Sequence, residues 1–219
     1  MTNEQLDELI DTMNNGGFAD LIFSKQISDT VTYARCWSGI PDEKIACITG
    51  HEMYFVIADG KYVATVQDGG SDLHLFVKEE HRRHGYLCRA MNTVILHHLF
   101  EKDSREVQRL TFESPTVKEY CMRRMGFRST GNLTAEITKT EIVEPSAINE
   151  TATRLTRDSF KTLRQRLRRA QYALEMCRDQ VCMLGASTED LEYLIEELIH
   201  LDDRVVSDIE KQQGIRLPF

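Results

Sequence analysis

Residues 73–91, LHLFVKEEHRRHGYLCRAM, give the clearest prediction of local structure in this chain of 219 residues. The stretch begins as an apolar strand and passes through a basic loop that contains one glycine, Gly85. Apolar residues then recur at intervals of three and four as far as His98, so one face of a long helix is apolar. The stretch therefore predicts a strand that leads through a short loop into a helix ending at about Lys102.

The loop of this stretch predicts an anion site. Arg82, Arg83 and His84 bring positive charge to the start of the helix, where unpaired backbone N–H groups and the positive end of the helix dipole also lie. Gly85 allows the backbone to come close to a phosphate, because glycine has no Cβ to obstruct the approach. We expect a ligand that carries phosphate groups, and an ordinary surface loop is the alternative.

The N-terminal part, residues 1–43, is expected to be helical. Residues 3–14 predict a first helix, which Thr2 caps and which ends in the run Asn14-Asn15-Gly16-Gly17. Residues 18–43 are ambiguous, because Phe18, Leu21, Ile22 and Ile27 suit a second helix whereas residues 37–42 suit a loop.

Strand patterns begin at residue 44. Residues 44–49 predict a short strand, and residues 53–58 and 62–67 predict a hairpin. The turn of this hairpin is Asp59-Gly60, which is among the strongest local hairpin signals.

Further elements follow the long helix. Residues 107–113 predict a strand, and Pro115 begins a short helix that ends at Gly126. Residues 127–130 and 133–143 predict one or two closing strands. The order of elements indicates an α/β fold with a mixed, mostly antiparallel sheet flanked by helices.

The C-terminal part follows a different pattern. Residues 144–157 have no clear period and predict a linker after a domain of residues 1–143. Residues 158–184 show the alternating three- and four-residue spacing of a coiled-coil seam. A short loop then leads to a second helix ending at Gly214, so residues 158–214 predict an antiparallel helical hairpin. The second helix has an apolar stripe of Leu191, Leu194, Leu198, Leu201, Val205 and Ile209.

The charges of this hairpin predict contact between its two helices. The first helix carries Lys161, Arg164, Arg166, Arg168 and Arg169. The second carries Asp202, Asp203, Asp208 and Glu210, which would lie beside those basic residues in an antiparallel pair. A self-complementary face explains this distribution better than a nucleic-acid patch. We expect the hairpin to mediate self-association or to bind a protein partner.

Composition narrows the class of protein. The net charge of −8 disfavours binding to nucleic acid, and the sequence shows neither a signal peptide nor a run of apolar residues that could span a membrane. The six cysteines lack the paired spacing of a metal site. We therefore expect a cytoplasmic protein with reduced thiols and no metal.

Two segments resemble the GNAT superfamily of N-acetyltransferases. Residues 77–87 are similar to the acyl-CoA-binding segment of that family, Arg/Gln-x-x-Gly-x-Gly/Ala after a strand ending in valine. Residues 120–127 resemble a later helix of the family, which ends in a Gly-Phe step. The two segments occur in the expected order, and the resemblance covers about residues 44–143.

The resemblance implies a GNAT-like fold and an acetyl-CoA cofactor. Phe76 and Val77 would contact the pantetheine arm through their backbones. The pyrophosphate would be surrounded by Arg82, Arg83, His84, Gly85, Tyr86 and Leu87. An unidentified amine would attack the thioester directly, without a metal.

The catalytic residues that the resemblance implies depart from the family pattern. The family's frequent general acid, a tyrosine, falls on Met122, and Tyr120 is the available substitute. A general base usually lies on the strand before Val77, where Asp72 and His74 are the nearest titratable groups. Leu87 stands where the family has glycine or alanine.

These departures leave a second function open. A catalytically degenerate GNAT-like domain could act as a structural or binding module in a larger assembly. A component of a virus particle, located in the virion, would be one such case.

Overall fold

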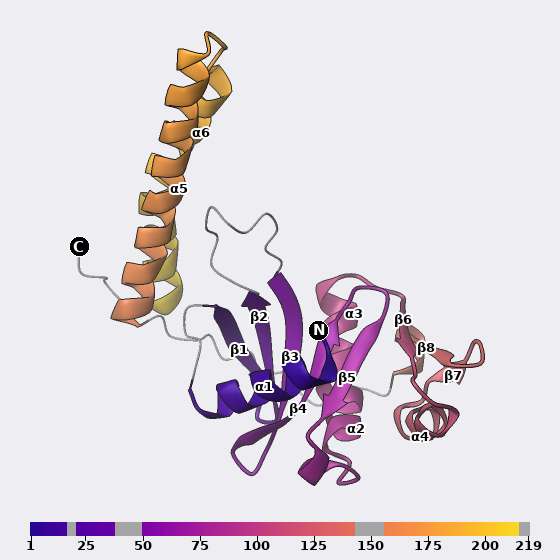
Figure 1. Cartoon of the computed structure of the whole chain (residues 1–219). Coiled ribbons are helices and arrows are strands. Elements are labelled where there is room, and N and C mark those ends of the chain that lie inside the picture. The colour runs from indigo at the N-terminus through magenta and orange to yellow at the C-terminus, as the bar shows by residue number, and fades with distance from the viewer. Residues whose placement is uncertain (17–20, 38–49, 143–155, 215–219) are drawn as a thin grey trace. The chain divides into compact units, whose positions relative to one another are not determined.

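The computed structural model describes residues 1–16, 21–37, 50–142 and 156–214. It divides into two compact units, Met1–Thr153 and Arg154–Phe219. The division falls within the segment that the sequence predicts as a linker. Figure 1 labels the helices and strands of each unit.

The first unit is built on a five-stranded sheet in which consecutive strands pair antiparallel in the order β1-β2-β3-β4-β5. The strands are β1 (Ile22–Ser28), β2 (Val31–Trp37), β3 (Gly50–Ala58), β4 (Lys61–Asp68) and β5 (Leu73–Val77). Asp59 and Gly60 both have positive φ, at 51° and 75°, which is the conformation of a type I′ turn. The predicted hairpin is therefore confirmed, and β3 begins three residues earlier than expected.

The helix expected within residues 18–43 is wrong, because β1 and β2 occupy most of this region. The burial of β1 is weakly patterned, and among its residues only Ile27 is fully buried. The helix-like spacing of a few apolar residues was therefore a poor guide, and the pairing of the whole of β2 with β3 decides the structure. The predicted strand at 44–49 lies outside the described residues.

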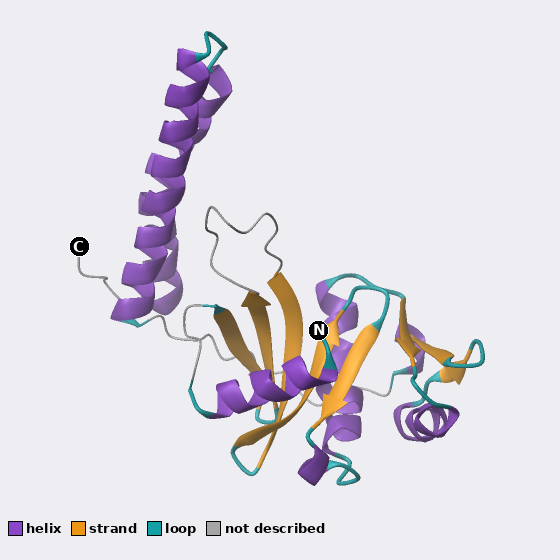
Figure 2. Cartoon of the chain, viewed as in Figure 1, coloured by secondary structure: helices purple, strands orange, loops and turns teal. Residues whose placement is uncertain are grey.

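Helix α1 (Asn3–Asn14) packs on one face of this sheet (Figure 2). The prediction is confirmed, including the cap at Thr2, which forms a capping box with Gln5. Leu6 and Ile10 are buried in a cluster that contains Phe76 of β5. The Lys78 ammonium, just after β5, donates to Asp7 at 2.7 Å and Asp11 at 2.9 Å, so α1 is fixed to the end of this strand.

The opposite face is covered by the predicted long helix, which consists of α2 (Tyr86–Ala90), a π-helical turn η2 (Met91–Ile95) and α3 (Leu96–Lys102). The larger core contains residues from all three segments, among them Ala90, Met91 and Leu99. The π-helical turn was not predicted. The Asn92 side chain in this turn donates to the Arg124 carbonyl at 2.9 Å, so the helix is tied to α4 (Pro115–Met125).

A second, three-stranded sheet has the order β6-β8-β7 and lies beyond β5. Its strands are β6 (Val107–Thr111), β7 (Arg128–Ser129) and β8 (Thr134–Thr138). Pro115 begins α4 and Gly126 ends it with φ 79°, as predicted, and Ser114 is the N-cap. β8 is shorter than the predicted range 133–143, because a 3₁₀ turn η3 (Lys139–Glu141) with its own capping box follows Thr138.

The second unit consists of α5 (Arg157–Met183) and α6 (Glu189–Gln213), which contact each other. Phe160, near the start of α5, packs with Val206 and Ile209, near the end of α6, so the helices run in opposite directions. The buried residues of α6 include Ile195 and Val206, which the predicted stripe does not contain. Leu194, which it does contain, is 47% exposed, because α5 covers only one side of a wide apolar face.

The fold class is mixed α/β with a mostly antiparallel five-stranded sheet and flanking helices, as expected. In the part of the chain that the structure describes, none of the helices has the length and apolar character needed to cross a membrane.

Two buried thiols predict a specific loss of stability in alkaline solution. Burial raises the pKa of Cys36 to about 12 and that of Cys121 to about 11, from an ordinary value of 9.0. Above pH 9.0 the unfolded chain therefore releases these protons before the native chain does. Their stabilising effect is complete below that pH and is lost as the pH rises through the native values.

We expect each thiol to lower the free energy of unfolding by about 1.4 kcal/mol per pH unit within this window. Urea unfolding at a series of pH values would measure the slope. Cys36→Ala should make the slope shallower, and replacing the exposed Cys182 by alanine is the matched control that should leave it unchanged. Equal slopes in all three proteins would contradict the prediction.

Candidate functional site

A cavity of about 610 Å³ lies where β5 and β6 separate. In the described residues one isolated bridge, a parallel one, joins Asp72, the residue before β5, to Arg109 of β6. The Asp72 carboxylate accepts hydrogen bonds from the backbone N–H of Leu73, at 3.0 Å, and of Thr111, at 2.9 Å. Asp72 therefore fastens the strands at one end, and the cavity opens beyond it. Its volume is in the range of pockets that hold small molecules and cofactors.

The backbone of β5 offers hydrogen-bonding groups toward this opening. The Lys78 N–H donates to the Val63 carbonyl at 3.0 Å, which sets the alternation of the β4–β5 ladder. His74 and Phe76 share the parity of Lys78 and direct their backbone groups to β4, whereas Leu75 and Val77 direct theirs to the opposite side. An extended ligand with amide groups can bind to such a strand edge.

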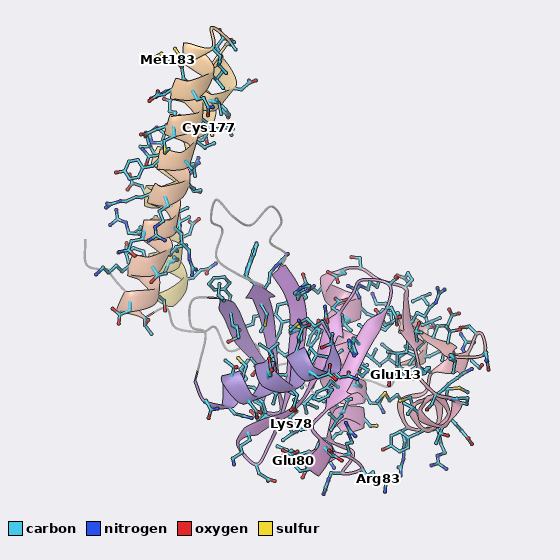
Figure 3. The ribbon with its side chains drawn as sticks, viewed as in Figure 1. Lys78, Glu80, Arg83, Glu113, Cys177 and Met183 are labelled. Carbon is cyan, nitrogen blue, oxygen red and sulfur yellow. The ribbon has the colours of Figure 1, made fainter. Side chains whose placement is uncertain are left out.

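The loop after β5 forms one end of the cavity. It contains the 3₁₀ turn η1 (Glu79–His81), and Arg83 and Gly85 have positive φ, at 68° and 79°. Gly85 is the N-cap of α2, so no side chain caps the first-turn N–H groups. Figure 3 labels Glu80 and Arg83 on this loop.

Most of the predicted cofactor-binding residues line the cavity. They are Phe76, Val77, Arg82, Arg83, Gly85, Tyr86 and Leu87. The Arg82 Nε donates to the Val77 carbonyl at 3.2 Å, which holds the guanidinium beside the end of β5. His84 is not in the lining; its ring stacks on Tyr86, with the centroids 5.6 Å apart and the planes at 8°.

Leu87 is 8% exposed and belongs to the larger core. Its side chain therefore fills space beneath the loop, and a larger residue than glycine is accommodated there.

His74 lines the cavity from β5 and has one fixed ring nitrogen. Its Nε2 lies 2.9 Å from the side-chain oxygen of Asn3 at the start of α1. With the amide oxygen as the acceptor, the tautomer that fits this contact carries its hydrogen on Nε2 and leaves a lone pair on Nδ1. The arrangement suits a proton acceptor.

Tyr120 lines the cavity from α4 and is paired with Cys88 of α2, whose Sγ is 3.8 Å from the phenol oxygen. The hydrogen bond with Cys88 and the proximity of that thiol raise the pKa of Tyr120 above its ordinary value. Burial raises the pKa of Cys88. Both groups are therefore protonated at neutral pH, and the phenol can act as a proton donor.

The three predicted catalytic residues thus line one cavity but differ in their surroundings. The two backbone N–H groups bound to Asp72 favour a structural task for this carboxylate, whereas His74 and Tyr120 suit proton transfer. Sequence reasoning missed Asn3 and Cys88. Neither lies in a recognisable motif, because the packing of α1 on β5 and of α4 on α2 brings them to the site.

Three carboxylates outside the cavity lining, Glu52, Asp68 and Asp103, lie close enough together to hold a metal ion. Lys102 forms ion pairs with Glu52 and Asp103, and Arg105 with Asp68 at 2.7 Å and Asp103 at 2.5 Å. These two cations compensate the negative charge of the carboxylates, so the cluster is an ion-pair network.

Comparisons with protein-family models, curated proteins and solved structures found no match to this chain.

Proposed function

We propose that the first unit binds an acyl coenzyme A in the cavity between β5 and β6 and transfers its acyl group to an amine, as GNAT N-acetyltransferases do. The observation that carries this proposal is the combination of a separated strand pair with a basic, glycine-containing loop at its end. Either feature alone is common, whereas together they suit a long ligand with amides in the middle and phosphates at one end.

The residues present fit this ligand. The backbone groups of Leu75 and Val77 would bind the pantetheine amides. The predicted backbone contact of Phe76 is replaced by one of Leu75, because the Phe76 backbone is directed to β4. Arg82, Arg83 and the N–H groups of the first turn of α2 would bind the pyrophosphate. A Cβ at Gly85 would meet no atom of the described chain within 4 Å, so the space beside this glycine is open to a phosphate.

The thioester of acyl coenzyme A supplies an activated acyl group. In the proposed reaction, the amine nitrogen forms a bond to the carbonyl carbon and the carbon–sulfur bond breaks. His74 Nδ1 would accept the proton that the amine loses, and the Tyr120 hydroxyl would donate a proton to the departing sulfur. Glu113, which follows β6 and lines the cavity, is a further carboxylate that could accept a proton from an incoming amine (Figure 3).

A thiol-release assay tests acyl transfer. Incubation with acetyl-CoA and a panel of primary amines should release free coenzyme A thiol in proportion to enzyme, at least about 100-fold faster than His74→Ala, as expected for loss of a general base. Tyr120→Phe keeps the ring and should also slow release, whereas His200→Ala, on the exposed surface of α6 in the second unit, should not. Equal release by wild type and His74→Ala would contradict the role of His74.

A second function, a binding or structural module, is favoured by one observation: Met122 stands where the family has its tyrosine, and it packs partly against the core. Such a module would retain the cavity without turnover and would act through assembly by α5 and α6, for instance in a virus particle. Binding of acetyl-CoA without thiol release on any amine would support this function over catalysis.

A further inference from the structure

The α5–α6 pair exposes two apolar stripes beside its own helix contact. On α5 the stripe is Leu163, Ala170, Cys177, Val181 and Leu184, and on α6 it is Leu194, Leu198, Leu201 and Val205. All nine residues are exposed or half-buried, and Leu184 is 78% exposed. Their spacing of three, four or seven residues is that of a helix-packing seam. The α5–α6 contact thus leaves part of its seam uncovered.

The stripes turn to the same side of the pair. Each stripe lies to one flank of the residues that face the partner helix, such as Phe160 on α5 and Ile195 on α6. In two right-handed helices that run in opposite directions, these flanks point the same way. A pair with one apolar face is half of a four-helix bundle, and burying that face would complete the core.

The charges of the pair indicate what covers this face. Residues 158–169 of α5 contain five Lys or Arg and one Asp, whereas residues 189–197 of α6 contain five Asp or Glu and no Lys or Arg. The basic segment lies beside the end of α6, and the acidic segment lies beside the end of α5. At the first of these ends α6 also carries Asp202, Asp203, Asp208 and Glu210 against Arg204 and Lys211, so this end keeps only a small excess of positive charge, whereas the other end is strongly acidic.

We infer that the apolar face binds a second copy of this chain in the antiparallel sense. An antiparallel copy brings the basic end of each pair to the acidic end of the other, while the apolar stripes meet between them. A parallel copy would place like charges together at both ends and is disfavoured. The product is a symmetric dimer joined by a four-helix bundle.

Sedimentation of the full chain at micromolar concentration tests this inference. Wild type should be a dimer, and Leu194→Lys with Leu201→Lys should be a monomer with unchanged helix content by circular dichroism. Met176→Lys is the matched control: Met176 is 70% exposed but lies on the face of α5 away from both stripes, so this variant should remain dimeric. Cys177 and Met183 mark α5 in Figure 3.

Charge reversal tests the antiparallel sense. Arg166→Glu with Arg169→Glu reverses the basic end, and Asp190→Lys with Glu197→Lys reverses the acidic end. Each pair of substitutions should weaken the dimer at least about 10-fold, as expected for juxtaposed like charges. The variant with all four substitutions should form the dimer again. Such a rescue would show that the weaker dimers of the two double variants do not result from misfolding.

A monomeric wild type would overturn the inference. A dimer that none of the stripe or charge variants weakens would overturn it as well. Because the substitutions lie outside the first unit, acetyl-CoA binding by each variant reports on the proposed function independently.

Discussion

Gly85→Glu is expected to abolish measurable binding of acetyl-CoA while the protein remains folded. Gly85 has φ 79°, so any side chain costs about 1–2 kcal/mol of backbone strain. The larger effect on binding comes from a carboxylate placed where the pyrophosphate should lie. Repulsion together with the loss of close approach should weaken binding at least about 100-fold.

Gly60→Glu is the matched control for this variant. Gly60 has φ 75° in the β3–β4 turn and open space around its Cβ position, so the strain and the added charge are similar. It does not line the cavity between β5 and β6. We expect Gly60→Glu to lose stability comparably and to bind acetyl-CoA as wild type does. Similar affinities for the two variants would show that the loop is not the phosphate site.

Asp72→Ala is expected to lower the free energy of unfolding by about 3 kcal/mol, because two backbone N–H groups lose a charged acceptor. The separation of β5 and β6 would no longer be fixed beside the cavity, so acetyl-CoA affinity should also fall. Urea unfolding and calorimetry measure the two effects.

Asp72→Asn distinguishes a structural role from a catalytic one. The amide oxygen of asparagine can still accept from the Leu73 and Thr111 N–H groups, but the side chain cannot act as a base. We expect this variant to keep most of the stability and most of the thiol release. A stable Asp72→Asn protein that binds acetyl-CoA but releases no thiol would contradict the structural role and make Asp72 the base.

The elements that the sequence predicted well carry their own local signals. Thr2 and Gln5 form a capping box, Asp59-Gly60 forms a turn that needs positive φ, and Pro115 and Gly126 begin and end α4. Such signals depend on neighbours in sequence, so no tertiary context is needed to read them. The long helix after Gly85 was equally clear from its apolar period.

The failures have a common physical cause. β1 and β2 are strands because β2 pairs with β3 on one side and with β1 on the other. The local pattern of Ile22–Ser28 does not reveal this pairing. The π-helical turn at Met91–Ile95 and the shorter β8 likewise depend on contacts or caps beyond a simple period.

The site was predictable as a set of residues but not as a geometry. The basic loop and β5 were found together because they are consecutive in sequence. The separation of β5 from β6, the pairing of His74 with Asn3 and the pairing of Tyr120 with Cys88 join distant segments. Tertiary packing therefore gives Asp72 and His74, which are two positions apart in the sequence, different hydrogen-bond partners.

Calorimetric titration of the wild-type chain with acetyl-CoA tests the central claim, that the cavity between β5 and β6 is an acyl-CoA site. We predict saturable binding to one site per chain, which is weakened in Arg82→Ala and lost in Gly85→Glu. The absence of binding at millimolar acetyl-CoA, or binding that both substitutions leave unchanged, would contradict the account.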